Sequence, residues 1–291
     1  MGLRLVQRLA VGGMAELFLA NRVDESGRYA GTVVIKTVRA DEPDPGRAAR
    51  VLRDEARLGA ALQHPGIVRL LDAAIDVERP HLELEYVFGR DLDQIQRRCR
   101  ARDEPVPLPH VRTILIDLLE ALDYAYFDAE LDGAPVRAVH LDVSPQNVLV
   151  GFDGRTRLLD FGLAEGRHRL PDARGTTLAG KTSYMAPEQI LNQPVDHRTD
   201  VFAAGISSWE LLAHRRLFSQ GSDREAAAAV VGTAAPWPRC PERPVPAGLA
   251  WWTWRALRRR RGLRPRRARD WAAALRRGDR RTRDEARGAL G

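Results

Sequence analysis

The chain has 291 residues, of which 44% are hydrophobic and 29% are charged. This length suits one two-lobed domain or two small domains, and the composition excludes a disordered chain. The two cysteines, Cys99 and Cys240, are too few for a disulfide framework. No run reaches the roughly 18 consecutive apolar residues of a membrane span, and the first residues lack the apolar core of a signal peptide. We therefore expect a cytoplasmic protein with no membrane partner.

The basic residues are distributed unevenly, both along the chain and between Arg and Lys. Residues 251–291 contain 15 arginines against four acidic residues, a net charge of +11 in a chain whose total is +7. Such an end can bind nucleic acid, but a solvated helix face is the simpler interpretation, and we do not expect a nucleic-acid partner. Of the 46 basic residues, only Lys36 and Lys181 are lysines. A lysine in a chain that otherwise uses arginine indicates a need for a compact ammonium group rather than a planar guanidinium at that position.

The first third of the chain is predicted to contain strands followed by a helix. Two strands flank a turn at Gly12 and Gly13, and a β-branched strand that carries Lys36 follows them. Residues 47–62 have helical periodicity, and Glu55 falls on the apolar face of that helix. A carboxylate buried on such a face needs a partner, and Lys36 is the candidate. The alternative is a glutamate at the edge of the face that reaches water.

After a strand at residues 81–87 the chain is predicted to become helical. Apolar periodicity predicts a helix at residues 111–126, and further helices are expected at residues 199–213 and 251–257. A β-rich front part and a helical remainder indicate two lobes, joined near residues 86–90.

The densest cluster of polar side chains surrounds a predicted hairpin in the middle of the chain. Asp153 and Gly154 form a strong turn signal, and the centre of that turn is equidistant from Asn147 and Asp160. Antiparallel pairing then places Asn147 opposite Asp160 at the open end of the hairpin, with Asp142 five residues upstream of Asn147. Carboxylate and carboxamide oxygens are the ligands that Mg²⁺ prefers. The pattern alone allows either a magnesium site or residues that cap turns.

Several short motifs, in their order and spacing, resemble the signature set of the protein kinase family. The motifs are the strand ending in Lys36, the helix residue Glu55, the loop from His140 through Asp142 to Asn147, the triplet Asp160-Phe161-Gly162, the triplet Ala186-Pro187-Glu188, the helix start at residues 200–205, and Arg264, which in the family pairs with the equivalent of Glu188. Each motif alone is weak, but their common order leaves little room for chance.

Within the family, the chain is most similar to bacterial Ser/Thr kinases of the Hanks type. Residues 12–17 resemble their phosphate-binding loop, and residues 144–147 keep the Pro-x-Asn ending of Ser/Thr kinases. The resemblance implies an α+β fold of two lobes, with a β-rich N-lobe at about residues 1–87 and a helical C-lobe at about residues 88–277. Residues 278–291 are then expected to form a short basic tail.

The resemblance also implies transfer of the γ-phosphate of ATP, with Mg²⁺, to Ser and Thr hydroxyls of protein substrates. Asp142 would orient and deprotonate the hydroxyl, and Lys36, held by Glu55, would orient the α- and β-phosphates. Asn147 and Asp160 would hold Mg²⁺. The nucleotide site is expected to involve Lys36 and Asp160 together with Ala10, Gly12, Gly13, Leu17, Val34 and Leu149. Leu84 would be the gatekeeper residue. Glu85 and Val87 would contact adenine through their backbone groups.

Three departures from the family pattern bear on activity. In the first, Ala10 and Ala15 replace glycines of the phosphate-binding loop, where a methyl group restricts the backbone. In the second, Leu141 replaces the Arg that binds a phosphorylated activation segment. We therefore predict that phosphorylation of Thr176 or Thr177 is not the main activating event.

The third departure is Ser144, which replaces the catalytic-loop Lys two residues after Asp142. Lys181 stands where the family usually has a Thr that faces the catalytic Asp. We hypothesise that Lys181 supplies the missing charge near Asp142 and the γ-phosphate, as a further catalytic residue. The alternative is a surface lysine in a loop.

Three other functions remain open from the sequence. A pseudokinase that acts as a nucleotide-binding scaffold or allosteric regulator would explain the altered glycines, Leu141 and Ser144, but the intact charged residues oppose it. A small-molecule kinase is opposed by an activation segment that runs at full length to Glu188. A nucleic-acid-binding module built on the Arg-rich end is compatible with catalysis. No appended sensor domain is recognisable, so we expect regulation by a separate partner.

Overall fold

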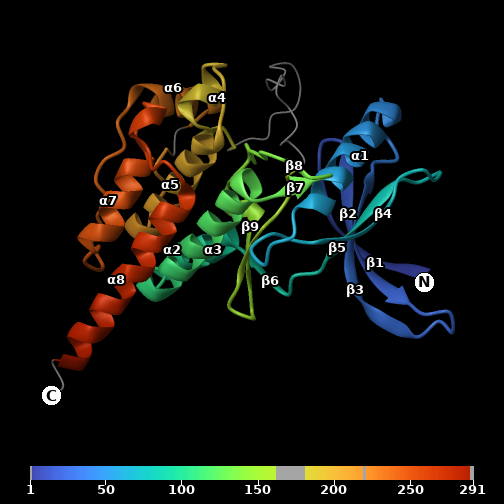
Figure 1. Ribbon diagram of the computed structural model, residues 1–291, viewed down its shortest axis with the longest axis horizontal. Helices are drawn as coiled ribbons and strands as arrows, with labels where there is room; N and C mark the ends of the chain where they lie inside the picture. The colour runs from blue at the N-terminus through green and yellow to red at the C-terminus, as the bar shows by residue number, and fades with distance from the viewer. Residues whose placement is uncertain (1, 162–180, 219–220, 289–291) are drawn as a thin grey trace.

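The computed structural model describes residues 2–161, 181–218 and 221–288, with the side chains of the last helix described up to Gly278. These residues form two lobes, one rich in strands and one helical (Figure 1). A short link, residues 86–88, joins the lobes between β5 (His81–Glu85) and β6 (Gly89–Asp91). The two-lobed α+β fold is confirmed.

The small lobe is an antiparallel sheet with one helix packed against it. The strand order is β1-β2-β3-β5-β4, so β1 and β4 form the edges. Helix α1 (Pro45–Ala61) is capped at its N-terminus by Asp44, whose side chain accepts a hydrogen bond from the amide of Arg47 at 2.8 Å. Its buried Leu52 and Ala56 pack with Leu82 of β5. The strands before β5 are β1 (Gly2–Val11), β2 (Ala15–Val23), β3 (Tyr29–Val38) and β4 (Leu70–Ala74).

The large lobe is built around helix α5 (His197–Ala213), which is buried along nearly its whole length. Because α5 is covered on all sides, it needs no amphipathic pattern. Trp271 of α8 and Leu119 of α3 belong to the same buried cluster as Val201 of α5. The other helices are α2 (Leu92–Ala101), α3 (Leu108–Phe127), α4 (Pro187–Ile190), α6 (Asp223–Gly232), α7 (Ala247–Ala256) and α8 (Ala268–Gly288). The three helices predicted for this part of the chain correspond to α3, α5 and α7.

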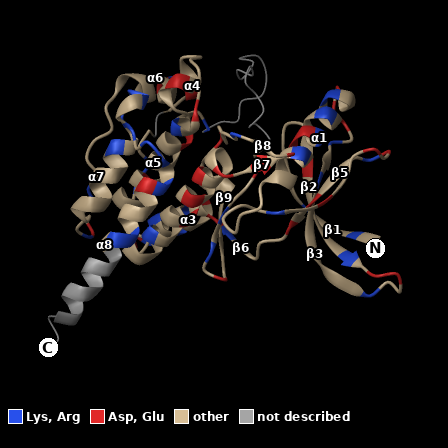
Figure 2. Ribbon diagram, viewed as in Figure 1, with Lys and Arg blue, Asp and Glu red and all other residues tan. Residues whose placement is uncertain are grey.

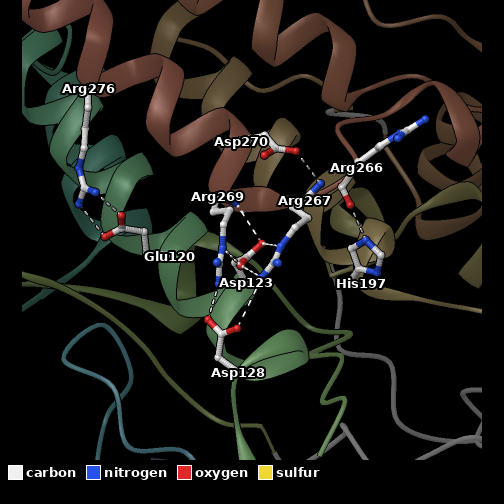
Figure 3. Close-up of polar contacts among 9 residues, drawn as sticks. All are labelled: Glu120, Asp123, Asp128, His197, Arg266, Arg267, Arg269, Asp270 and Arg276. Atoms are coloured by element: carbon white, nitrogen blue, oxygen red, sulfur yellow. Dashed lines mark hydrogen bonds and ion pairs between the residues drawn. The ribbon is translucent and has the colours of Figure 1, made fainter. Parts of the chain in front are cut away.

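Arginines of the C-terminal region attach α8 and the segment before it to α3. Asp123 of α3 accepts hydrogen bonds from Arg267, at 2.6 Å, and from Arg269, and Arg276 donates to Glu120 at 2.7 Å (Figure 3). Burial raises the pKa of Asp123, but hydrogen bonds from the two guanidinium groups outweigh it and hold this pKa below its usual range. Basic and acidic residues are interspersed along the large-lobe helices (Figure 2). The ion pairs of Arg267, Arg269 and Arg276 with acidic residues of α3 neutralise part of the basic charge of the C-terminal region.

The C-terminal boundary expected from the sequence does not coincide with a change of structure. Helix α8 continues from Ala268 to Gly288, so the tail expected at residues 278–291 begins inside a helix.

Candidate active site

The loop of residues 140–147, called the catalytic loop below, is held by a buried carboxylate at the start of α5. Asp200 accepts hydrogen bonds from the amides of His140 at 2.7 Å and Leu141 at 2.9 Å. Burial raises the pKa of Asp200 to about 6, although His140 and the two amides act in the opposite direction. Leu141 has a φ of 66°, a conformation that costs about 1–3 kcal/mol in a residue other than glycine. The two bonds to Asp200 offset this strain.

His140 joins the catalytic loop to the segment that carries Asp160. Its Nδ1 accepts a hydrogen bond from the amide of Asp142 at 3.2 Å, so its Nε2 carries the hydrogen and donates to the Leu159 carbonyl at 2.6 Å. The ring packs edge-on against Phe161, with centroids 4.6 Å apart. One fully buried histidine therefore positions Asp142 and Asp160 relative to each other.

Two side chains donate to the carboxylate of Asp142. Asn147 Nδ2 donates both to Oδ2 of Asp142 and to its carbonyl, each at 2.8 Å. Lys181 Nζ forms an ion pair with the same Oδ2. The Asp142 side chain is 18% exposed, so the carboxylate is fixed in position yet accessible to a hydroxyl group. Lys181 thus lies beside Asp142, as hypothesised from the sequence.

Lys36 lies between two carboxylates from different parts of the chain. Its Nζ is 2.6 Å from Glu55 Oε1 on α1 and 3.0 Å from Asp160 Oδ1, which follows β10 (Thr156–Leu158). Burial lowers the pKa of Lys36, but the two carboxylates outweigh it and hold this pKa above its usual value. The predicted pairing of Lys36 with Glu55 is confirmed, and the contact with Asp160 ties the small lobe to the large lobe.

One face of the small-lobe sheet collects several residues predicted to line a nucleotide site. Leu17 lies opposite Lys36 and also opposite Ala10, and Val34, two positions before Lys36, lies opposite Leu84. Opposite residues of antiparallel strands project to the same face, and so do residues two positions apart on one strand. This is the face from which Lys36 reaches the large lobe.

The turn between β1 and β2 contains the two adjacent glycines. The amide of Gly12 donates to the carbonyl of Ala15 at 2.8 Å, and Arg39 donates to the carbonyls of Gly12 at 3.4 Å and Gly13 at 3.2 Å. Arg39 thereby fastens the turn to the end of β3.

The remaining nucleotide-site candidates lie in and beyond the link between the lobes. The carboxylate of Glu85 pairs with Arg69 at 3.0 Å and with Arg157 at 3.2 Å, and its amide donates to the Arg69 carbonyl at 3.0 Å, so the expected adenine contact of Glu85 would have to use its carbonyl. Val87 lies in the link, and Leu149 lies on β9 (Val148–Gly151) in the second sheet. Their contacts with adenine stay predictions.

The hairpin formed by β9 and β10 has a different register from the predicted one. The carbonyl of Asn147 accepts from the amide of Leu159 at 2.8 Å, in line with the pairing of the two strands. The turn contains three residues, 152–154, and Gly154 has a φ of 79°. A three-residue loop with glycine in the left-handed region shifts the register by one position from that of a two-residue turn. The prediction that Asn147 directly faces Asp160 was therefore wrong, because Asp160 follows one position farther along.

Asn147 and Asp160 nevertheless fit a Mg²⁺ site. The amide nitrogen of Asn147 donates to Asp142, which leaves the amide oxygen Oδ1 as the ligand atom. The Asp160 side chain is 49% exposed. In the part of the chain that the structure describes, no group of three or more His, Cys, Asp or Glu residues could hold a metal by itself. Mg²⁺ is usually bound by one or two protein carboxylates together with substrate phosphates and water, which this pair suits.

A buried ion pair fixes the end of the activation segment to the large lobe. The two terminal nitrogens of Arg264 are 2.6 Å and 2.8 Å from the two carboxylate oxygens of Glu188, and Thr199 donates to Glu188 at 2.9 Å. Burial raises the pKa of Glu188, but Arg264 outweighs it and holds this pKa below its usual range. The pairing expected from the family resemblance is confirmed.

Two positioning residues were missed in the sequence analysis. Gln189 of α4 donates to the Leu141 carbonyl at 2.9 Å and accepts from the Ala186 amide at 2.9 Å, and no local pattern marks it. Asp200 was identified only as a helix start, although a carboxylate followed directly by an apolar run is a usable signal. The predictions for Gly162, Thr176 and Thr177 lie outside the described residues.

A family model described as protein kinase domain matches residues 4–244 of this chain. That match covers far more than half of the sequence and agrees with the two lobes and the site geometry. The chain belongs to the protein kinase family. No helix among the described residues has the length and apolar character needed to cross a membrane.

The names of the curated relatives differ in the acceptor residue that they state, which is tyrosine in one case and serine or threonine in others. The tyrosine-protein kinase MasK of Myxococcus xanthus is 38% identical over 219 residues, which cover 75% of this chain and 34% of that protein. The probable serine/threonine-protein kinase SCO3848 of Streptomyces coelicolor is 33% identical over 72% of this chain and 30% of that protein. The serine/threonine-protein kinase PknB of Mycobacterium leprae is 31% identical over 70% of this chain and 31% of that protein. The chain thus spans about a third of the length of these relatives.

Proposed function

We propose that this chain is an ATP- and Mg²⁺-dependent kinase that phosphorylates Ser and Thr hydroxyls of protein substrates. The observation that carries the proposal is that two sets of contacts coexist where the lobes meet. Lys36 contacts Glu55 and Asp160, while Asp142 contacts Asn147. A scaffold that only holds a nucleotide needs at most the first set, whereas phosphoryl transfer needs both.

Each residue has a task that follows from its position. Lys36, kept protonated by its two carboxylate partners, orients the α- and β-phosphates of ATP. Asn147 and Asp160 would hold Mg²⁺, which when bound would neutralise charge on the phosphates. Asp142 orients the substrate hydroxyl and accepts its proton.

The transfer is a displacement at the γ-phosphorus. The Ser or Thr oxygen forms a bond to that phosphorus, and the hydroxyl proton passes to Asp142. The bond from phosphorus to the bridging oxygen breaks, and its electron pair leaves with ADP. Most of the rate comes from positioning and electrostatics, so the contacts that fix Asp142 and Lys36 carry the function.

Two observations support Ser and Thr as acceptors. Residues 144–147 end in the Pro-x-Asn of Ser/Thr kinases, and two of the relatives are named as Ser/Thr kinases. The name of MasK makes Tyr the acceptor that an experiment has to exclude.

Transfer of labelled γ-phosphate from Mg-ATP tests the proposal. The substrates are the protein itself and three peptides that differ only in a central Ser, Thr or Tyr, with Asp142→Asn and Lys36→Ala run alongside. We expect label on Ser or Thr that is lost in both variants. Label on Tyr alone would make the chain a tyrosine kinase. No transfer, with Mg-ATP still raising the melting temperature, would make it a nucleotide-binding pseudokinase.

A further inference from the structure

Lys181 is brought to the catalytic carboxylate by a backbone turn that is anchored in the large lobe. The 3-10 helix η2 (Thr182–Tyr184) follows Lys181 directly, and the amide of Tyr184 donates to the Lys181 carbonyl at 3.0 Å. The Tyr184 hydroxyl donates to the buried Glu210 of α5 at 2.7 Å. The Lys181 side chain therefore extends from a fixed point, and it is 23% exposed where its ammonium meets Asp142.

The catalytic loop itself brings no cation to this side of the site. Residues 140–147 contain neither Lys nor Arg, and Ser144 stands two residues after Asp142. The Ser144 side chain is buried, and its hydroxyl has no hydrogen-bond partner within the described ranges. Lys36 is engaged by carboxylates on the nucleotide side. Among the described residues, Lys181 is thus the one cation that contacts the Asp142 carboxylate.

We propose that Lys181 is a catalytic residue whose ammonium contacts the γ-phosphoryl group during transfer, in place of the cation that Ser144 does not supply. The inference rests on the kinase function proposed above. A hydroxyl held by Asp142 receives the phosphoryl group next to this carboxylate, and hence within reach of the Lys181 ammonium. Negative charge on the γ-phosphoryl oxygens has to be stabilised while the bond to ADP breaks, and a cation already fixed at that place stabilises it.

The same contact explains why this position is a lysine in a chain that uses Arg for all but two of its 46 basic residues. An ammonium is a compact point charge that can divide its contacts between the carboxylate and the phosphoryl group. A guanidinium would bind the Asp142 carboxylate through two parallel hydrogen bonds and compete with the substrate hydroxyl. Lys181→Arg is therefore expected to lose activity although it keeps the charge.

Relocation of the cation within the site tests the proposal most directly. The set is Lys181→Ala, Lys181→Gln, Ser144→Lys and the double variant Ser144→Lys/Lys181→Ala, with Arg277→Ala as a control that removes an exposed cation from α8. Two quantities are measured for each full-length variant: the steady-state rate of phosphate transfer, and the ratio of affinities for Mg-ATP and Mg-ADP by calorimetry. The affinity ratio reports on contact with the γ-phosphate without requiring turnover.

We expect Lys181→Ala and Lys181→Gln to lower kcat about 10²-fold and to lower the preference for ATP over ADP about tenfold. The double variant should recover at least about tenfold in kcat relative to Lys181→Ala, and Arg277→Ala should match the unmodified protein. Lys181→Gln keeps most of the length of the side chain and a hydrogen-bond donor for Asp142. Its loss of kcat therefore measures the contribution of the positive charge alone.

Several results would overturn the assignment. Full activity in Lys181→Ala would do so, and so would increased activity, which would mean that the contact with Asp142 blocks the base. An unchanged preference for ATP over ADP would exclude contact with the γ-phosphate. If the unmodified protein transfers no phosphate, the kinase proposal fails, and the affinity ratios of the two single Lys181 variants still decide whether Lys181 contacts the γ-phosphate.

Discussion

The two lysines of the chain contact different carboxylates of the active site and are held in different ways. Lys36 extends from an inner strand of the five-stranded sheet and contacts two carboxylates, one of them across the junction of the lobes. Lys181 extends from the segment before η2 and contacts one carboxylate, in the catalytic loop. The nucleotide side, around Lys36, keeps every charged residue of the family pattern. The acceptor side, around Asp142, departs from that pattern at Leu141, Ser144 and Lys181.

The difference follows from what holds each side in place. Side chains hold the nucleotide side, so replacing any of them removes a contact. The acceptor side is held largely through its backbone, because Asp200 binds the amides of His140 and Leu141 and Gln189 binds the Leu141 carbonyl. Backbone contacts do not depend on the side chains at positions 141 and 144, which can change without moving Asp142. Substitutions on the acceptor side should therefore act mainly on kcat, with Lys181 as the exception that also contacts the γ-phosphate, and those on the nucleotide side should act mainly on ATP binding.

The largest effect is expected for Asp142→Asn. Loss of the proposed proton acceptor should lower kcat about 10³-fold, while the affinity for Mg-ATP changes by less than about twofold. Steady-state kinetics and calorimetry measure the two quantities, and Asp54→Asn, an exposed carboxylate on α1, is the matched control. A loss of ATP affinity as large as the loss of kcat would remove the distinction between the two sides.

Glu188→Gln should cost about 3–5 kcal/mol of folding free energy, because it leaves the fully buried Arg264 without its charged partner. The acceptor side should lose its structure at lower urea concentration than the rest of the protein, because Glu188 anchors the end of the activation segment. Urea denaturation at pH 7 measures the loss, with the exposed Glu104→Gln as control. A loss below about 1 kcal/mol, as for a surface pair, would contradict this role.

The same pair predicts a pH dependence. The pKa of Glu188 is held below its ordinary value of 4.5, so the pair stabilises the protein fully above that pH and less as the pH falls through the folded-state pKa. The difference in unfolding free energy between the unmodified protein and Glu188→Gln should thus be constant near neutral pH and narrow below about pH 4.5. The pKa of buried Asp200 is raised rather than lowered, but Asp200 is present in both proteins, so its contribution cancels in the difference between their unfolding free energies. A gap that stays constant down to pH 3 would show that the charge of Glu188 is not what stabilises the fold.

Lys36→Ala should lower kcat/KM about 10²-fold, mainly through weaker ATP binding. The variant removes the partner of both Glu55 and Asp160 and so loosens the nucleotide side and the lobe junction together. Kinetics over a range of Mg-ATP concentrations separate kcat from KM, and Arg57→Ala, an exposed cation on α1, is the control. An unchanged KM for ATP would place the role of Lys36 in the chemical step instead.

Features that depend on residue type and on spacing along the chain could be predicted from the sequence. The Lys36–Glu55 pair followed from a carboxylate on an apolar helix face, and the closeness of Lys181 to Asp142 followed from two departures that compensate each other. The hairpin register could not be predicted, because Asp153-Gly154 suits both a two-residue and a three-residue turn and only the observed φ of Gly154 decides between them. The contacts of Asp200 and Gln189 were out of reach because they join a side chain to a backbone group 60 and 48 positions away.

Gln189→Ala gives the smallest of these effects and the sharpest test of backbone support. The variant removes the donor to the carbonyl of Leu141, whose φ is 66°, and also the acceptor of the Ala186 amide, and it leaves every charged residue of the site unchanged. A lost hydrogen bond of about 1 kcal/mol should lower kcat about fivefold and leave the KM for ATP unchanged, as kinetics can measure. Gln193→Ala, just beyond α4, is the control and should match the unmodified protein. If Gln189→Ala keeps full kcat, the bonds from Asp200 to the amides of His140 and Leu141 are sufficient to hold the backbone at position 141, and the support from Gln189 is dispensable.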